Sequence, residues 1–127
     1  MSIAQKEVTL IEQAHKEAVV TSIEDIANQL QDLLTVRLAA YITGVKSGKT
    51  VKRWANGDEG IRQESEQRLR TAYEIVRLLS AYDSPSVVKA WFIGMNPQLD
   101  DTAPAEAIRE GRFREAINAA KSFVVSG

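Results

Sequence analysis

Apolar residues recur at intervals of three and four along almost the whole chain. No stretch alternates apolar and polar residues in the manner of a half-buried strand. The cleanest example follows Ser22, where one helical face carries Ile23, Ile26, Ala27, Leu30, Leu33 and Leu34. Because this spacing is that of amphipathic helices, the chain is predicted to be all-α.

Capping residues and prolines mark the expected helix boundaries. Ser22 followed by Asp25 resembles a helix start, and Ser84-Pro85 is typical of an N-cap followed by the first helical residue. Glycines are expected to close the helices at Gly94 and Gly111. The predicted helices cover 3–20, 23–34, 38–45, 50–57, 62–82, 85–93, a short stretch from 104 and a last stretch from 113.

The chain offers little for catalysis or metal binding. It has no cysteine, and its one histidine, His15, has no second histidine with which to share a metal. Asp100 and Asp101 are adjacent carboxylates in a turn region, where aspartate is favoured for local hydrogen bonding. We therefore expect a protein that is not an enzyme and that uses no metal and no cofactor.

No segment of the sequence predicts insertion into a membrane. The longest apolar runs, 39–42 and 90–93, are far shorter than the roughly 18 residues that a membrane helix needs. The first residues, 1–7, lack the basic region and apolar core of a secretory signal. The expectation is a cytoplasmic protein without a membrane partner.

One stretch, Gly44 to Thr50, looks like a phosphate-binding P-loop but departs from it in spacing and context. A P-loop has four residues between its first glycine and Gly-Lys-Thr, whereas this chain has three. A P-loop also follows a strand, and residues 38–42 lie among predicted helices. The same residues are better explained as part of a helix-turn-helix.

The near balance of 16 basic and 17 acidic residues hides a basic island. Residues 1–34 sum to −4 and residues 35–70 to +4, and residues 36–57 contain five basic side chains and no acidic one. A charge cluster alone is usually a solvated surface, so its structural context decides what it means.

That context is a helix over residues 38–45, a short turn and a second helix over 50–57. Gly44 is expected at the tight turn, while Val51 and Trp54 face inward and turn their basic neighbours outward. The second helix would enter the major groove of DNA. The predicted DNA-binding residues are Arg37, Lys46, Ser47, Lys49, Thr50, Lys52 and Arg53. Val51 comes seven positions after Gly44, one more than the usual interval, so a purely structural helical hairpin stays an alternative.

The second half of the chain carries an ordered set of features: Trp91, then Asn96-Pro97 with Leu99, then a proline-started short helix from Pro104 to Gly111, then a final helix. This set resembles the toxin-binding domain of the Xre/MbcA/ParS antitoxins. A helix-turn-helix upstream is also the family's arrangement. The expected organisation is an N-terminal helical extension (1–21), a helix-turn-helix domain (22–83) and a C-terminal toxin-binding domain (84–127).

The resemblance implies an antitoxin that neutralises a RES-domain toxin, an NAD-consuming enzyme, by covering its active site with the C-terminal helix and tail. It also implies repression of the pair's own promoter. The expected toxin-binding residues are Arg112, Arg114, Phe123, Val124, Val125, Ser126 and Gly127. The alternative is a stand-alone DNA-binding regulator without a toxin. Because such regulators bind two-fold sites, we expect a homodimer, with its seam on helix 3–20 or on the 23–34 face.

Overall fold

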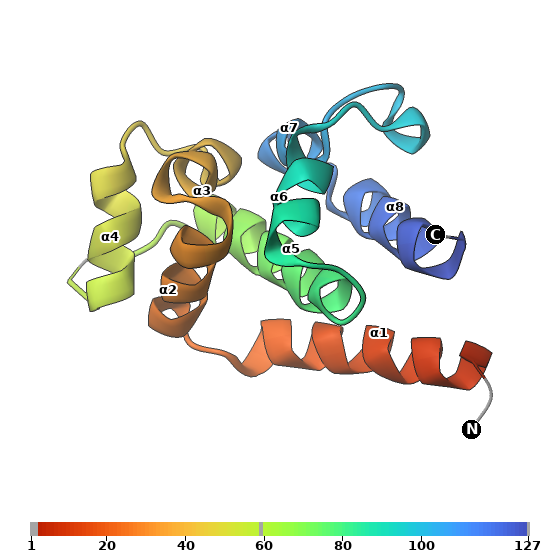
Figure 1. Cartoon of the computed structure of the whole chain (residues 1–127). Coiled ribbons are helices and arrows are strands. Elements are labelled where there is room, and N and C mark those ends of the chain that lie inside the picture. The colour runs from red at the N-terminus through yellow and green to blue at the C-terminus, as the bar shows by residue number, and fades with distance from the viewer. Residues whose placement is uncertain (1–2, 59, 127) are drawn as a thin grey trace.

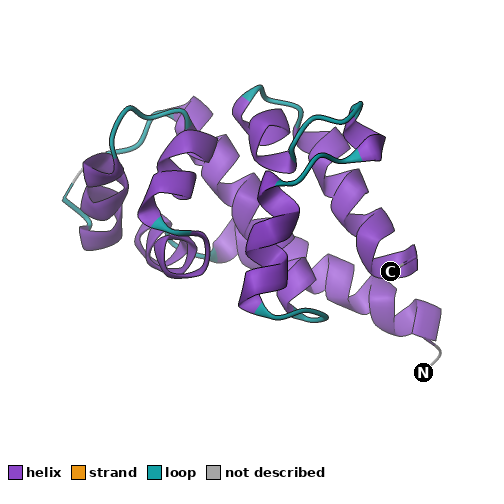
Figure 2. Cartoon of the chain, turned by 45° about the horizontal axis from the view of Figure 1, so that its top comes forward, coloured by secondary structure: helices purple, strands orange, loops and turns teal. Residues whose placement is uncertain are grey.

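The structure is a computed structural model that describes residues 3–58 and 60–126, and every regular element in them is helical (Figures 1 and 2). The elements are α1 (Ile3–Val20), α2 (Ile23–Leu34), α3 (Val36–Thr43), α4 (Gly48–Asn56), α5 (Gln63–Ser80), α6 (Pro85–Ile93), the 3-10 helix η1 (Pro97–Leu99), α7 (Pro104–Arg109) and α8 (Phe113–Ser126). The all-α prediction is confirmed.

The predicted caps explain several boundaries. The Ser22 hydroxyl accepts a hydrogen bond from the Asp25 amide at the start of α2. A single residue, Thr35, joins α2 to α3, and its φ of 83° lies where a β-branched residue is strained by roughly 1–3 kcal/mol. Its hydroxyl accepts a hydrogen bond from the Leu38 amide. The chain therefore turns sharply between α2 and α3.

Helix α5 is the central element of the molecule. It packs against α1, α2, α3, α6, α7 and α8. Its buried residues are Ser65, Leu69, Thr71, Ala72, Tyr73, Ile75, Val76, Leu78 and Leu79. The sequence predicted one apolar face, carried by Leu69, Ala72, Tyr73, Val76 and Leu79. The structure also buries Ile75 and Leu78, because α1 and α8 cover a second side of α5.

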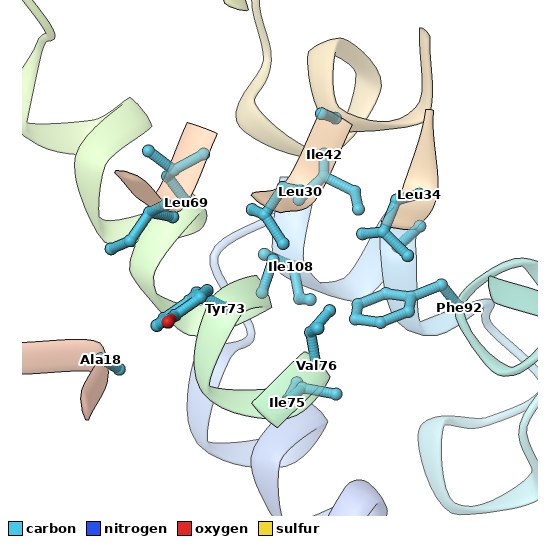
Figure 3. Close-up of a cluster of buried hydrophobic side chains, with 14 of the residues drawn as sticks. Ala18, Leu30, Leu34, Ile42, Leu69, Tyr73, Ile75, Val76, Phe92 and Ile108 are labelled. Atoms are coloured by element: carbon cyan, nitrogen blue, oxygen red, sulfur yellow. The ribbon is translucent and has the colours of Figure 1, made fainter. Parts of the chain in front are cut away.

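One hydrophobic core runs across the predicted boundary at residue 84. Figure 3 shows Phe92 of α6 and Ile108 of α7 beside Leu34 of α2 and Val76 of α5, and all of these side chains belong to one buried cluster. A second, small buried cluster joins Leu99 of η1 to Ala107 of α7 and Ala119 of α8. The division into residues 1–21, 22–83 and 84–127 stays a prediction, and the main core contains buried side chains from all three of these ranges.

Helix α1 packs lengthwise on α5 through Ala14 and Ala18. The Arg70 guanidinium donates hydrogen bonds to the Ala18 and Thr21 carbonyls at 2.8 Å each, and Arg77 pairs with Glu17 at 2.8 Å. The N-terminal segment is therefore tied to α5 by both apolar and charged contacts.

The apolar face of α2 is already used within one chain. Ile26, Ala27, Leu30 and Leu34 are all buried against other helices of the same molecule. Ile23 and Leu33 of the same face are partly exposed, so the 23–34 face and helix 3–20 both stay predictions for the dimer seam. The homodimer itself stays a prediction.

Replacing Phe92, which is fully buried, by alanine should lower the free energy of unfolding by about 3–5 kcal/mol through lost burial and a residual cavity. Urea denaturation followed by circular dichroism measures this loss. Val87→Ala, on an exposed position of the same helix, is the control and should cost far less.

Because Phe92 shares one core with α2, hydrogen exchange should accelerate in α2 and α5 as well as in α6. Unchanged protection of α2 in Phe92→Ala would show instead that the two sides of residue 84 unfold independently.

Candidate functional site

Helix α4 lies at one end of the molecule and packs on α2 and α3 (Figure 1). Val51, Trp54 and Ala55 form its buried side. The Trp54 indole donates a hydrogen bond to the Gly60 carbonyl, and the Asn28 amide of α2 donates one to the Ala55 carbonyl. These contacts confirm the predicted inward face and fix which side of α4 meets solvent.

The turn before α4 differs in part from the prediction. Gly44 closes α3 with a φ of +81°, as expected of the tight turn. However, α4 begins at Gly48 and not at Thr50, because Ser47 acts as its N-cap and accepts a hydrogen bond from the Lys49 amide at 3.1 Å. The connection between α3 and α4 is therefore residues 44–47. Gly48 and Lys49, which the sequence placed before the second helix, form its first two residues.

Gly48 lies against the beginning of α3. A Cβ at this position would come within 2.3 Å of Cγ1 of Val36. Such a distance is far shorter than a van der Waals contact between carbons. Glycine therefore permits the close approach of α4 to α3.

The predicted DNA-binding residues gather on α3, the turn and α4. The exposed members are Arg37, Lys46, Ser47, Lys49, Lys52 and Arg53, and Thr50 is half-buried. The Ser47 hydroxyl is engaged as the α4 cap, so its first role is structural. The others form a basic solvent-facing surface on the α3–α4 pair, while their contact with DNA stays a prediction.

The structure adds two arginines that sequence reasoning missed. Arg109 of α7 joins Arg37 and Lys46 around a groove of about 540 Å³. A second hollow beside the turn, of about 380 Å³, is lined by Arg62 and Glu64 together with Lys46 and Thr50. Arg62 follows the basic island closely in sequence, whereas nothing in the sequence signals that Arg109 lies near residues 37–48.

The predicted toxin-binding residue Arg112 is engaged within the chain. Its guanidinium donates two hydrogen bonds to the Glu115 carboxylate at 3.0 Å each and one to the Thr102 hydroxyl. Asp100 lies 3.7 Å away and Glu110 3.9 Å away. Arg112 therefore fastens the loop before α7 to the start of α8, whereas Arg114 is exposed.

Electrostatics around Arg112 favour the charged state of both partners. The Arg112 guanidinium holds the pKa of the Glu115 carboxyl below its usual value, first through the hydrogen bond and then through charge attraction. In turn, hydrogen bonding to Glu115 raises the pKa of Arg112.

The C-terminal tail is the end of helix α8. Val124 is buried in the main core, and Phe123 packs against the Trp91 ring with the ring centroids 6.4 Å apart. Val125 is 59% exposed. The side chain of Ser126 and all of Gly127 lie outside the described residues. Of the predicted apolar tail residues, Val125 is therefore exposed, Phe123 is half-buried and Val124 is buried.

Two further apolar side chains of the C-terminal half are exposed. Ile93, the last residue of α6, and Met95, in the loop that follows, are 58% and 80% exposed. Sequence reasoning did not select them, because a helix end before Asn96-Pro97 predicts a turn and not a contact surface. Large exposed apolar side chains near one another are typical of partner-binding surfaces.

His15 makes a contact that the sequence did not predict. Its Nδ1 atom lies 3.1 Å from Oε1 of Glu74, which links α1 to α5 at an exposed position. In the part of the chain that the structure describes, no three acidic or histidine side chains come together as metal ligands would. Within the same residues, no helix has the length and apolar character needed to cross a bilayer.

Comparison with known proteins gives one informative match. The chain is 33% identical over 78 residues to the probable mycobacterial cidal antitoxin Rv3188 of Mycobacterium tuberculosis. This chain is similar to an antitoxin. The match covers 61% of this chain and 66% of the relative, so the chain spans just under two thirds of that protein's length. No family model and no solved structure matches the chain.

Replacing Gly48 by alanine should lower the free energy of unfolding by about 1–3 kcal/mol, because the added methyl group overlaps Val36. Gly60→Ala is the matched control, since a Cβ there has no atom within 4 Å, and it should be close to neutral. Urea denaturation measures both. If both variants are equally stable, the close approach of α3 and α4 is not what requires glycine.

Replacing Glu115 by glutamine should lower stability at pH 7, because the amide loses the charge attraction to Arg112. Since the folded-state pKa of Glu115 is lowered, its stabilisation is present above the unfolded value of about 4.3 and is lost as pH falls through the folded-state pKa. The difference between wild type and variant should therefore disappear in acid.

Urea midpoints at pH 7 and in acid measure this difference. Glu106→Gln is the control, since this exposed glutamate makes no ion pair within residues 3–58 and 60–126. A wild-type advantage that grows as pH falls would contradict the assigned sign.

Proposed function

We propose that this chain is an antitoxin, a binding protein without catalytic activity of its own. The observation that carries the proposal is the 33% identity to a mycobacterial cidal antitoxin over 78 residues. The resemblance of Trp91, Asn96-Pro97 and the helices after Pro104 to the toxin-binding domain of Xre/MbcA/ParS antitoxins supports it. On this basis the partner is a RES-domain toxin that consumes NAD.

The C-terminal end of the molecule is the proposed toxin-binding surface. Val125 offers an exposed apolar side chain on α8, and Ile93 and Met95 add apolar surface from α6 and its following loop. Exposed Arg114 supplies a positive charge for acidic groups of the toxin. Phe123 and Val124 serve this surface indirectly, because their packing on Trp91 and the core holds the end of α8 in place. Covering the toxin's active-site cleft with this surface excludes its substrate.

The other end of the molecule is the proposed operator-binding face. Lys49 and Lys52 project from α4 into solvent, while Val51 and Trp54 anchor the helix on α2 and α3. In a helix-turn-helix the second helix enters the major groove, and surrounding lysines and arginines neutralise phosphates. Repression of the antitoxin's own promoter, by a homodimer on a two-fold site, follows from this arrangement.

The decisive experiment is co-expression of the chain with the RES-domain enzyme encoded beside its gene. The enzyme alone should deplete cellular NAD and stop growth, and the full chain should restore both. Failure of the soluble, folded chain to rescue growth overturns the antitoxin function. Absence of any such enzyme beside the gene would favour the stand-alone regulator.

Val125→Asp should weaken toxin binding by at least about tenfold, because it places a charge on apolar interface surface. Val19→Asp on α1 is the matched control, since Val19 is 60% exposed and Val125 is 59% exposed. Titration calorimetry with the purified toxin measures both affinities. Equal affinities for the two variants would exclude the end of α8 from the interface.

A point substitution is preferred to deletion of residues 122–127. Deletion removes Val124 from the core and Phe123 from Trp91, so it destabilises α8 whatever the tail binds.

A further inference from the structure

We propose that Arg109, from the C-terminal half of the chain, is part of the DNA-binding face and contacts a backbone phosphate of the operator. This inference rests on the proposed operator binding and extends it. Arg109 lies on α7, 68 residues from Tyr41 of α3 in sequence, and the fold brings the two side by side.

The position of Arg109 is fixed by two contacts with one residue. Its guanidinium carbon lies 4.7 Å from the centre of the Tyr41 ring, and its Nη1 atom donates a hydrogen bond of 2.7 Å to the Tyr41 carbonyl. Stacking on an aromatic ring occupies the flat face of a guanidinium and leaves its edge for other hydrogen bonds. The side chain is therefore held in place before any ligand arrives, which lowers the entropic cost of binding.

The groove beside this pair is suited to an anion. Its lining residues are Val36, Arg37, Ala40, Tyr41, Val45, Lys46, Gly48 and Arg109. Three of these eight carry a positive charge and none is acidic. No carboxylate within the described residues forms an ion pair with Arg109, so its charge is available to a ligand.

The place of the groove on the helix-turn-helix identifies the anion as a phosphate of DNA. Its walls are α3, the turn at Lys46 and the first residue of α4. In this motif the first helix crosses the DNA backbone while the second reads base edges. An arginine beside the first helix therefore faces backbone, where guanidinium binds phosphate with two hydrogen bonds. Such a contact strengthens binding to any DNA sequence and adds no base specificity.

The test measures the salt dependence of binding to the gene's own promoter fragment and to an unrelated duplex of equal length. Arg109→Gln is compared with wild type, with Arg109→Lys, which keeps the charge, and with Lys89→Gln, an equal charge loss on α6 away from the groove. Each variant is first checked for wild-type circular dichroism and urea midpoint.

The expected result for Arg109→Gln is a slope of log affinity against log salt reduced by about 0.9, the value for one lost phosphate contact. Affinity should fall by a similar factor on both duplexes. Arg109→Lys should keep most of the slope, and Lys89→Gln should match wild type.

Three results would overturn the inference. If the wild-type slope of log affinity against log salt is steep and Arg109→Gln leaves it unchanged, the chain binds DNA but Arg109 contacts no phosphate. A loss of toxin affinity in Arg109→Gln without loss of DNA affinity assigns the groove to the protein partner. If the wild-type affinity does not depend on salt, the proposed operator binding is wrong, and so is the proposed role of Arg109.

Discussion

Burial of α5 on several sides is the constraint from which the rest of the arrangement follows. Leu69, Ile75, Val76 and Leu79 of this 18-residue helix point to more than one side of it, and all four are buried. One layer of helices cannot cover it, so α1 and α8 pack on one side and α2, α3, α6 and α7 on others. Helix α3, next to the proposed DNA-binding helix α4, and helices α6 and α8, next to the proposed toxin-binding surface, therefore all pack on α5.

Local physics made much of the fold predictable. Spacing of apolar residues identified the helices, and Ser22, Gly44 and Pro104 marked boundaries that the structure retains. The inward side of α4 was also predictable, since Val51 and Trp54 lie three residues apart on a short helix. The start of α4 was misplaced because Gly48 reads as a turn residue, whereas its missing Cβ permits contact with Val36.

Contacts between distant segments were beyond sequence reasoning. A periodic pattern says that a helix has an apolar face but not which helix covers it, so the sequence did not show that Ile26, Leu30 and Leu34 of α2 pack within the same chain. The pairing of Arg109 with Tyr41 and the burial of Val124 depend on α7 and α8 folding back on α3 and α5. An apolar chain end likewise predicts contact equally well with a partner or with the protein's own core.

The continuous core limits how chains with this fold can diverge in sequence. Residues 84–126 contribute Phe92, Ile108 and Val124 to a cluster completed by α2 and α5. A C-terminal segment transferred from a relative would bring side chains shaped for a different α5, so recombination between related genes would yield poorly packed hybrids. Altered binding to the proposed toxin is therefore expected to arise by substitution at exposed positions such as Ile93, Met95 and Val125, with the interior left unchanged.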